Sequence, residues 1–425
     1  MVNGKGKTVY DIWLSLAIGP GGAFGGLFDD HSDACGIYGE APGAWADTPG
    51  ISDSLRRRLD DKDLSEADRI ARFCEKNGIE TEVFGYEGYP SWISGIKNPP
   101  YLIYRRGTLS FPEIEKKLRV AIVGTRDMSA YGMRSAYRIA YEAASAGAVI
   151  VSGMARGIDG TAAAAALAAD GLTLAVTGCG PDIVYPREHE KLAEMIAGSG
   201  AVISEFPPGS PPVASHFPVR NRLISGLSHC TAVIEAAEKS GAMLTADIAS
   251  NQGRDVFALP GRIDDPLSAG PSLLLRRGAG ILLGAEDILS RYSDALPGAV
   301  DADAFARATL YSEARPEVLE ECGVRMPRDA GGDGVPGPAA APAARERAGG
   351  AKTGAGMTRK EIQPPEGELR DFWSAVPRDV PVSPDSFSGL GYTAGRAMKL
   401  LSMLEISGYI TGIPGGMYIR RTGGS

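Results

Sequence analysis

The sequence has few cysteines and no paired ones. Its 425 residues include five cysteines, and none forms a C-x-x-C pair. They stand singly, at Cys35, Cys74, Cys179, Cys230 and Cys322. An odd number of scattered thiols argues against a disulfide framework or a zinc site and is typical of a reducing compartment. We therefore expect a cytoplasmic protein with no metal site and no cofactor.

Long apolar runs are also lacking. The longest, residues 161–176, is mostly alanine and is interrupted by Asp170, whereas a membrane-spanning helix needs about 20 predominantly apolar residues. The first residues do not show the charged region, apolar core and cleavage site of a secretory signal. The sequence therefore predicts no association with a membrane.

Basic residues are outnumbered by acidic ones. The chain has 44 lysines and arginines against 52 aspartates and glutamates, which gives a formal net charge of −8. Dedicated nucleic-acid-binding proteins are usually basic. Composition therefore counts against such a partner, unless positive charge is gathered on one face of the molecule.

Apolar runs alternate with helical patterns across residues 119–292. The expected strands are residues 120–123, 148–151, 173–177, 201–204, 231–235 and 255–259. The expected helices lie near residues 130–146, 159–169, 187–197, 221–227 and 242–251. Uninterrupted apolar strands joined by helical crossovers predict an α/β fold with a parallel sheet that is buried on both faces.

The flanking regions have different patterns. Residues 1–80 carry amphipathic segments at 11–17, 50–59 and 65–77, which predict a small helical domain. Residues 81–118 are expected to form an extended connection into the core, with a short strand at 101–104. Residues 293–356 are rich in alanine, glycine, proline and charge, which predicts a flexible linker. Residues 357–421 show helical segments followed by a β-hairpin pattern, which suggests a winged helix.

The segment 216–228 is the most informative motif. It reads His-Phe-Pro-Val-Arg-Asn-Arg-Leu-Ile-Ser-Gly-Leu-Ser, so Arg220 and Arg222 flank Asn221, with Phe217 just upstream. We expect a helix here whose exposed first turn points its free N–H groups and both guanidiniums in one direction, which makes an anion site. An aromatic ring beside a phosphate site suits a stacked base. The segment holds no obvious nucleophile or general base, so it predicts binding rather than catalysis.

Three further loops follow expected strands and carry glycine and a cation. They are Gly124-Thr125-Arg126, the segment 152–159 with Gly153 and Arg156, and the segment 235–241 with Lys239, Ser240 and Gly241. Because the carboxyl ends of parallel strands share one edge of a sheet, these loops are expected to converge with the 216–228 segment. Several anion sites along one edge fit the phosphates of single-stranded nucleic acid better than one nucleotide. The alternative is that the glycines only permit close packing of strands on helices.

Two enzyme classes share this kind of fold. A dinucleotide dehydrogenase is disfavoured, because the glycines near 178–180 lack the third glycine of G-x-G-x-x-G and the second strand ends in Ser152 instead of an acidic residue. The alternative function is a nucleotide phosphoribohydrolase on a Rossmann-like fold. Such enzymes carry a Pro-Gly-Gly-x-Gly-Thr-x-x-Glu loop, which residues 235–245 do not match. Glu235 and Glu238 are the best candidates for acid–base chemistry, and a structural role is favoured for both.

Seven sequence blocks in order resemble the DNA-processing protein A family, DprA, also called Smf. The blocks are residues 120–126, 152–159, 185–189, 204–209, 216–227, 240–246 and 253–261. The resemblance covers residues 119–292 closely, and residues 1–118 and 357–421 more loosely. Tyr185, in the third block, is expected to add a ring at the rim of the site.

The resemblance implies a fold, a function and partners. The fold is an extended Rossmann-like core with an N-terminal helical domain of the sterile-alpha-motif type and a C-terminal winged helix. The function is a non-enzymatic one: binding and protecting incoming single-stranded DNA during natural transformation, and loading the recombinase RecA onto it, as a homodimer. The DNA site implied by the motifs comprises Gly124, Arg126, Gly153, Arg156, Phe217, Arg220, Asn221, Arg222 and Lys239.

Overall fold

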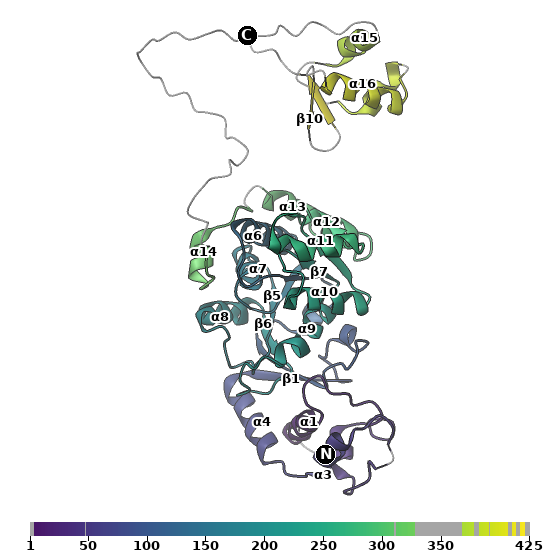
Figure 1. Ribbon diagram of the computed structural model, residues 1–425. Helices are drawn as coiled ribbons and strands as arrows, with labels where there is room; N and C mark the ends of the chain where they lie inside the picture. The colour runs from purple at the N-terminus through teal and green to yellow at the C-terminus, as the bar shows by residue number, and fades with distance from the viewer. Residues whose placement is uncertain are drawn as a thin grey trace, which may run out of the picture. The chain divides into compact units, whose positions relative to one another are not determined.

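The computed structural model describes residues 4–46, 48–309, 312–327, 368–377, 382–390, 392–406, 410–413 and 417–420. The chain divides into two compact units, residues 1–336 and 337–425. The first unit holds a nine-stranded sheet and the second a two-stranded one, drawn with their helices in Figure 1.

Seven neighbouring strands of the large sheet run parallel. In spatial order they are β6 (Ala201–Ser204), β5 (Thr173–Val176), β4 (Val149–Ser152), β3 (Arg119–Val123), β7 (Cys230–Val233), β8 (Asp255–Ala258) and β9 (Gly280–Ile281). All six strands predicted for this region are present, and β9 was not predicted. The fully buried strands β3 to β7 explain the continuous apolar runs in the sequence.

Helices cover both faces of this sheet. One face carries α6 (Ala130–Ser145), α7 (Ile158–Ala168), α8 (Glu190–Ser199) and α12 (Glu286–Tyr292). The other carries α5 (Phe111–Ile114), α9 (His216–Gly226), α10 (Gly241–Asn251) and α11 (Ala269–Arg276). Short 3-10 turns lie at η1 (Ser91–Ile93), η2 (Arg187–His189) and η3 (Pro266–Ser268). The predicted Rossmann-like α/β core is therefore confirmed.

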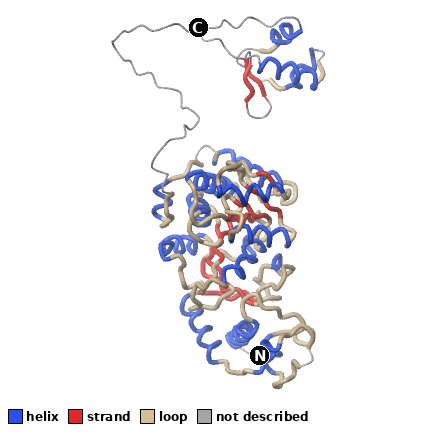
Figure 2. The backbone as a smooth tube through the Cα atoms, in the orientation of Figure 1, coloured by secondary structure: helices blue, strands red, loops and turns tan. Residues whose placement is uncertain are grey.

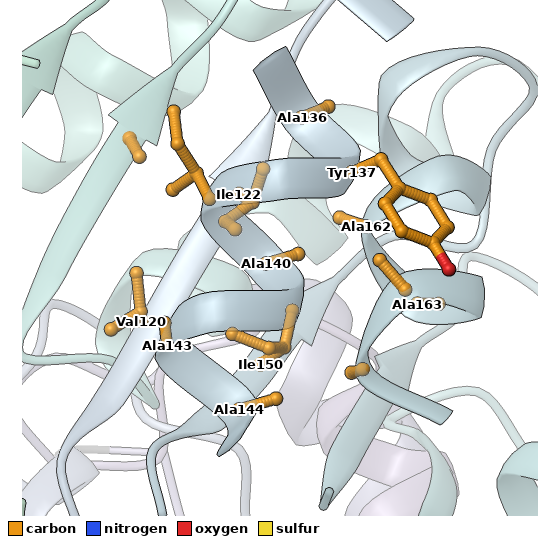
Figure 3. Packing of buried hydrophobic residues seen from close by; sticks show 14 of the residues in the cluster. Val120, Ile122, Ala136, Tyr137, Ala140, Ala143, Ala144, Ile150, Ala162 and Ala163 are labelled. Carbon is orange, nitrogen blue, oxygen red and sulfur yellow. The ribbon is translucent and has the colours of Figure 1, made fainter. Parts of the chain in front are cut away.

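The two cores follow from alternation along the strands. In β3, Val120 and Ile122 face the α6 side, whereas Ala121 and Val123 face the α9 side. Figure 3 shows the alanines of α6, including Ala140, beside Val120 and Ile122. These small side chains let α6 lie close to the sheet, so the strands are excluded from water on both faces.

The sheet extends into the N-terminal region through two antiparallel strands. β2 (Leu102–Gly107) pairs with β6, and β1 (Ile79–Val83) pairs with β2. They share a core with α1 (Gly4–Ile18), α2 (Ala34–Gly39), α3 (Asp53–Asp60) and α4 (Ser65–Asn77). Helices α1, α3 and α4 and a strand at 101–104 were predicted, whereas α2 and β1 were not. The helical region is thus joined to the core through the sheet itself.

The prediction of a flexible linker at residues 293–356 is wrong for its first part. Helices α13 (Ala302–Ala308) and α14 (Pro316–Glu321) lie within it. Leu319 and Cys322 are fully buried in the same core as α7 and α8, so this segment belongs to the first unit. Residues 328–356 of the expected linker lie outside the described residues.

The second unit has its own small core. Its elements are α15 (Glu368–Ala375), η4 (Pro384–Leu390), α16 (Ala394–Ile406), β10 (Ile410–Ile413) and β11 (Met417–Arg420). Phe372, Phe387 and Leu401 pack together in one cluster with the hairpin residue Ile410, and Figure 2 shows these helices in blue and the hairpin in red. The winged helix stays a prediction, because the expected hairpin turn and Arg421 lie outside the described residues. In the described part of the chain, no helix has the length and apolar character needed to cross a bilayer.

Candidate nucleic-acid interface

The sheet topology creates a cleft where the strand order reverses. The chain builds β3, β4, β5 and β6 toward one side, then returns to place β7 on the other side of β3. Ligands of doubly wound folds bind outside the carboxyl ends of the strands at such a reversal. Two adjoining hollows lie here and share Arg126, Ala155 and Phe217. We call them together the carboxyl-edge groove, lined chiefly by Thr125, Arg126, Arg156, Tyr185, Phe217, Arg220, Asn221 and Ser240.

Phe217 lies at the centre of this groove. Its half-buried ring is 5.5 Å from the guanidinium carbon of Arg126 and 5.7 Å from that of Arg220, measured to the ring centroid. The ring centroid of Tyr185 lies 5.7 Å from that of Phe217, with an angle of 44° between the planes. Tyr185 is 41% exposed. Two rings and a guanidinium that remain open to solvent can stack on a flat, electron-rich group.

Arg126 is an exposed cation of the groove. It follows β3 in a loop that Gly124 holds close to α7, where a Cβ at position 124 would lie 2.5 Å from the Ile158 side chain. Thr125 N donates a hydrogen bond to Glu235 O at 2.7 Å, which fixes the loop to the end of β7. Within the described part of the chain Arg126 has no ion-pair partner. Its charge is therefore available to a ligand.

Arg156 lies in the groove with a carboxylate partner. Its side chain is exposed and forms an ion pair with Glu188. This hydrogen bond holds the pKa of the Glu188 carboxyl below its usual value. The next residue, Gly157, has a φ of +74°, and a Cβ there would collide with Thr125 O. The loops after β3 and β4 thus pack directly on each other.

Arg220 is buried, which contradicts the prediction that it faces solvent from the first turn of a helix. α9 begins at His216, more than a turn before Arg220, and this side chain is on the floor of the groove. Its Nη1 donates to Gly153 O at 2.8 Å and also to Val176 O, while Nε donates to Asn221 Oδ1 at 3.1 Å. Burial lowers the pKa of Arg220, and nearby Asp159 opposes that shift. Arg220 therefore ties the ends of β4 and β5 to α9.

Arg222 is directed away from the groove, which corrects the prediction that two guanidiniums face the same way. It pairs with Glu205, and the two side chains are 12% and 7% exposed. Lys239 is exposed beside Ser240, a lining residue, without lining the groove itself. The predicted residues that line the groove are Gly124, Arg126, Gly153, Arg156, Phe217, Arg220 and Asn221.

Comparison with known proteins agrees with this architecture. The family model for DNA recombination-mediator protein A matches residues 81–293, which is half of the chain and contains the groove and the seven parallel strands. The chain belongs to the DNA recombination-mediator protein A family. The predicted resemblance is confirmed, and members of this family are recombination mediators rather than enzymes.

Curated relatives and a solved structure show how far the likeness reaches. The chain is 40% identical over 220 residues to DNA processing protein DprA of Bacillus subtilis, which covers 52% of this chain and 73% of that protein. It is 43% identical over 204 residues to Protein Smf of Escherichia coli, covering 48% and 54%. The X-ray structure of DprA from Streptococcus pneumoniae is 30% identical with a TM-score of 0.52, and the match covers 67% of this chain and 97% of that one.

One residue outside the predicted set lines the groove, and one earlier candidate for acid–base chemistry has a structural role beside it. Thr245, which the sequence did not point to, lines the groove one turn after Gly241, and its Oγ1 donates to Gly241 O at 3.0 Å. Glu235 has the structural role that was favoured for it, since it is fully buried and accepts a hydrogen bond from Ser129 N at 3.0 Å at the start of α6.

Proposed function

We propose that this chain is a cytoplasmic recombination mediator that binds single-stranded DNA in the carboxyl-edge groove, protects incoming DNA during natural transformation and loads RecA onto it. The observation that carries the proposal is the open ring of Phe217, flanked by the guanidinium of Arg126 and the ring of Tyr185. Membership of a family of DNA recombination mediators supports the same role.

The open ring of Phe217 favours a single strand over a duplex. A base in a duplex is already stacked and paired, so its face is not free to lie on a protein ring. Stacking on Phe217 requires an unpaired base and tolerates any sequence, and it contributes about 1–3 kcal/mol per base. Arg126 and Arg156, on the loops after β3 and β4, line the same hollow as Phe217, and we expect them to contact phosphates of the bound strand.

One titration tests this proposal. Labelled oligonucleotides of one length, single-stranded and duplex, are titrated with the protein and followed by fluorescence anisotropy. We expect tighter binding of the single strand, and a loss of about 5- to 150-fold for Phe217→Ala, which is the stacking contribution expressed as an affinity. Phe217→Tyr keeps the ring face and serves as the matched control. Equal affinity for both DNA forms, or full binding by Phe217→Ala, would overturn the proposal.

RecA loading has a separate test. RecA-catalysed ATP hydrolysis is followed on single-stranded DNA that a single-stranded DNA-binding protein already covers. The chain should shorten the lag before hydrolysis, and Phe217→Ala should not. Loading would be refuted if the lag is unchanged while DNA binding is intact.

We also propose a homodimer through the β9 edge of the large sheet. β9 is a two-residue edge strand; its Ile281 and the nearby Leu283 are 58% and 70% exposed. Apolar side chains on an unpaired sheet edge favour pairing with another chain. Leu283→Asp should therefore sediment as a monomer. Val213→Asp, which changes an exposed residue between β6 and α9, is the control and should not. A dimeric Leu283→Asp would remove this edge from the interface.

A further inference from the structure

The helix that carries Phe217 is held from a side that does not line the groove. Arg222 of α9 pairs with Glu205, which directly follows β6. Glu205 Oε1 also accepts a hydrogen bond from Gly21 N at 2.9 Å. Gly21 lies in the turn after α1, in the N-terminal helical region. One buried carboxylate thus links α9 to a segment almost 200 residues away in the sequence.

The turn at Gly21 approaches α9 closely. Gly21 has a φ of +73°, and a Cβ there would lie 2.9 Å from Val219 Cγ1. Gly21 O accepts a hydrogen bond from Asn98 Nδ2 at 3.1 Å, so the turn is fixed on both sides. Glycine is favoured here because both the left-handed backbone and the short distance to Val219 would strain any other side chain.

Glu205 is the partner that compensates the charge of Arg222. Nε and Nη1 of Arg222 are buried and have no hydrogen-bond partner in the described residues. Loss of the Glu205 charge would leave a buried guanidinium uncompensated, which proteins avoid by rearranging. Because Arg222 belongs to α9, we expect such a rearrangement to change the position of α9.

The start of α9 depends on the neighbouring residue. Phe206 stacks on His216, the first residue of α9, with ring centroids 4.0 Å apart and 22° between the planes. His216 Nδ1 lies 3.0 Å from Gly178 O. Phe217 comes next and packs over Gly178, where a Cβ would lie 3.3 Å from its ring. Residues 205 and 206 therefore fix both the rotation of α9 and the place where it begins.

We propose that Glu205 and Arg222 are positioning residues, and we call this ion pair the latch. When Gly21 is docked on Glu205, the latch sets the orientation of Phe217 and so the affinity for single-stranded DNA. The proposal rests on the proposed function, because it needs Phe217 to stack on a base. It reassigns Arg222 from a DNA contact to a residue that acts through another side chain. It also gives the N-terminal helical region a part in DNA binding without any contact to DNA.

A double-mutant cycle tests the latch. Glu205→Gln keeps the size of the side chain and removes its charge. We expect it to weaken single-stranded DNA binding about 3- to 30-fold in the unmodified chain and less than about 2-fold in a Phe217→Ala background, since coupled residues are not additive. Additive losses would overturn the latch, because general destabilisation does not depend on Phe217. Glu66→Gln, which breaks an exposed pair with Arg69 on α4, is the control and should change neither background.

Gly21→Ala is the second variant and acts from the N-terminal side. It leaves both charges in place and pushes on Val219. It replaces Glu205→Gln in the test if thermal unfolding shows that Glu205→Gln is not folded. The same dependence on Phe217 is expected, and unchanged binding by folded Gly21→Ala would overturn the link to the N-terminal region. If Phe217→Ala alone binds normally, the proposed function fails as well. If only additivity is found, the latch fails and the proposed function stands.

Discussion

Replacing Arg126 by alanine should weaken DNA binding in a way that depends on salt. Arg126 is exposed in the groove, with its guanidinium carbon 5.5 Å from the centroid of the Phe217 ring and no carboxylate partner in the described residues. A hydrogen bond between a charged group and its partner contributes about 1.5–3 kcal/mol. We therefore expect a loss of about 10- to 150-fold at low salt.

The salt dependence gives a second, independent magnitude. For single strands, the slope of log K against log salt changes by about 0.7 for each phosphate neutralised. Removing one contact should make the slope shallower by that amount. Between 50 and 200 mM salt the gap between Arg126→Ala and the unmodified chain should then narrow by about 2.6-fold.

Fluorescence anisotropy with a labelled single strand across this salt range measures both quantities. Arg72→Ala is the matched control, because Arg72 is also exposed and carries the same charge but lies on α4, where it pairs with Asp68. We expect Arg72→Ala to change affinity less than about 2-fold, since surface charges farther apart than about 10 Å are screened. Equal effects of the two variants, or an unchanged slope for Arg126→Ala, would refute a direct phosphate contact.

Three further predictions follow from the geometry of the first unit. Glu188→Gln should strengthen DNA binding about 2- to 5-fold by releasing Arg156, the gain expected from removing an exposed ion pair; weaker binding in the anisotropy assay would contradict this. Gly157→Ala should lower the melting temperature, because its φ of +74° and collision with Thr125 O cost about 1–3 kcal/mol or more; an unchanged melt would show that the loop adapts. Burial and two neighbouring arginines lower the pKa of His229 to about 4. As pH falls from about 6.5 toward 4, the unfolded chain therefore takes up a proton on His229 before the folded chain does, and the contribution of His229 to stability is lost. His229→Gln should make the melting temperature depend less on pH over that range.

The sheet could be predicted from the sequence because its strands are buried on both faces. Residues 120–123, for example, form an uninterrupted apolar run that ends at Gly124, and a run this short and bounded by glycine is typical of a buried strand. The edge strands β1 and β9 lack such an apolar run. β9 has two residues, one of them a glycine, and β1 has buried positions around two glutamates. Their pairing is decided by neighbouring strands rather than by their own composition.

The start of α9 was misplaced by five residues, and this changed the interpretation of the site. The apolar run after the arginines predicted a helix from residue 221, but α9 already includes Pro218, because proline is tolerated in the first turn, where N–H groups lack partners anyway. With the helix starting at His216, Arg220 falls on the floor of the groove and Arg222 on another side. Because a helix with 3.6 residues per turn rotates by about 100° per residue, Arg220 and Arg222 point in nearly opposite directions, and one is buried in the groove while the other forms an ion pair.

The partners of the arginines could not be predicted either. Glu188 lies 32 residues from Arg156, and Glu205 lies 17 residues from Arg222. Such pairs form between loops that meet at the sheet edge, and no local sequence pattern predicts them.

The prediction of a linker was wrong for a related reason. α13 and α14 have seven and six residues, too few for a helical period to be visible, although Leu319 is fully buried.

The net charge of −8 and the proposed polyanionic ligand are compatible because they act over different distances. At physiological salt the field of exposed carboxylates decays within about 8 Å, so it mainly slows the approach of DNA. Inside the groove, we propose, direct contacts dominate: those of the exposed Arg126, of the Phe217 ring, and of Arg156 once a phosphate displaces Glu188. A duplex cannot bring an unpaired base to Phe217 and would meet mainly the acidic exterior, whereas a single strand can enter far enough to gain these contacts. The acidic exterior would therefore add to the preference for single strands that we propose for the groove.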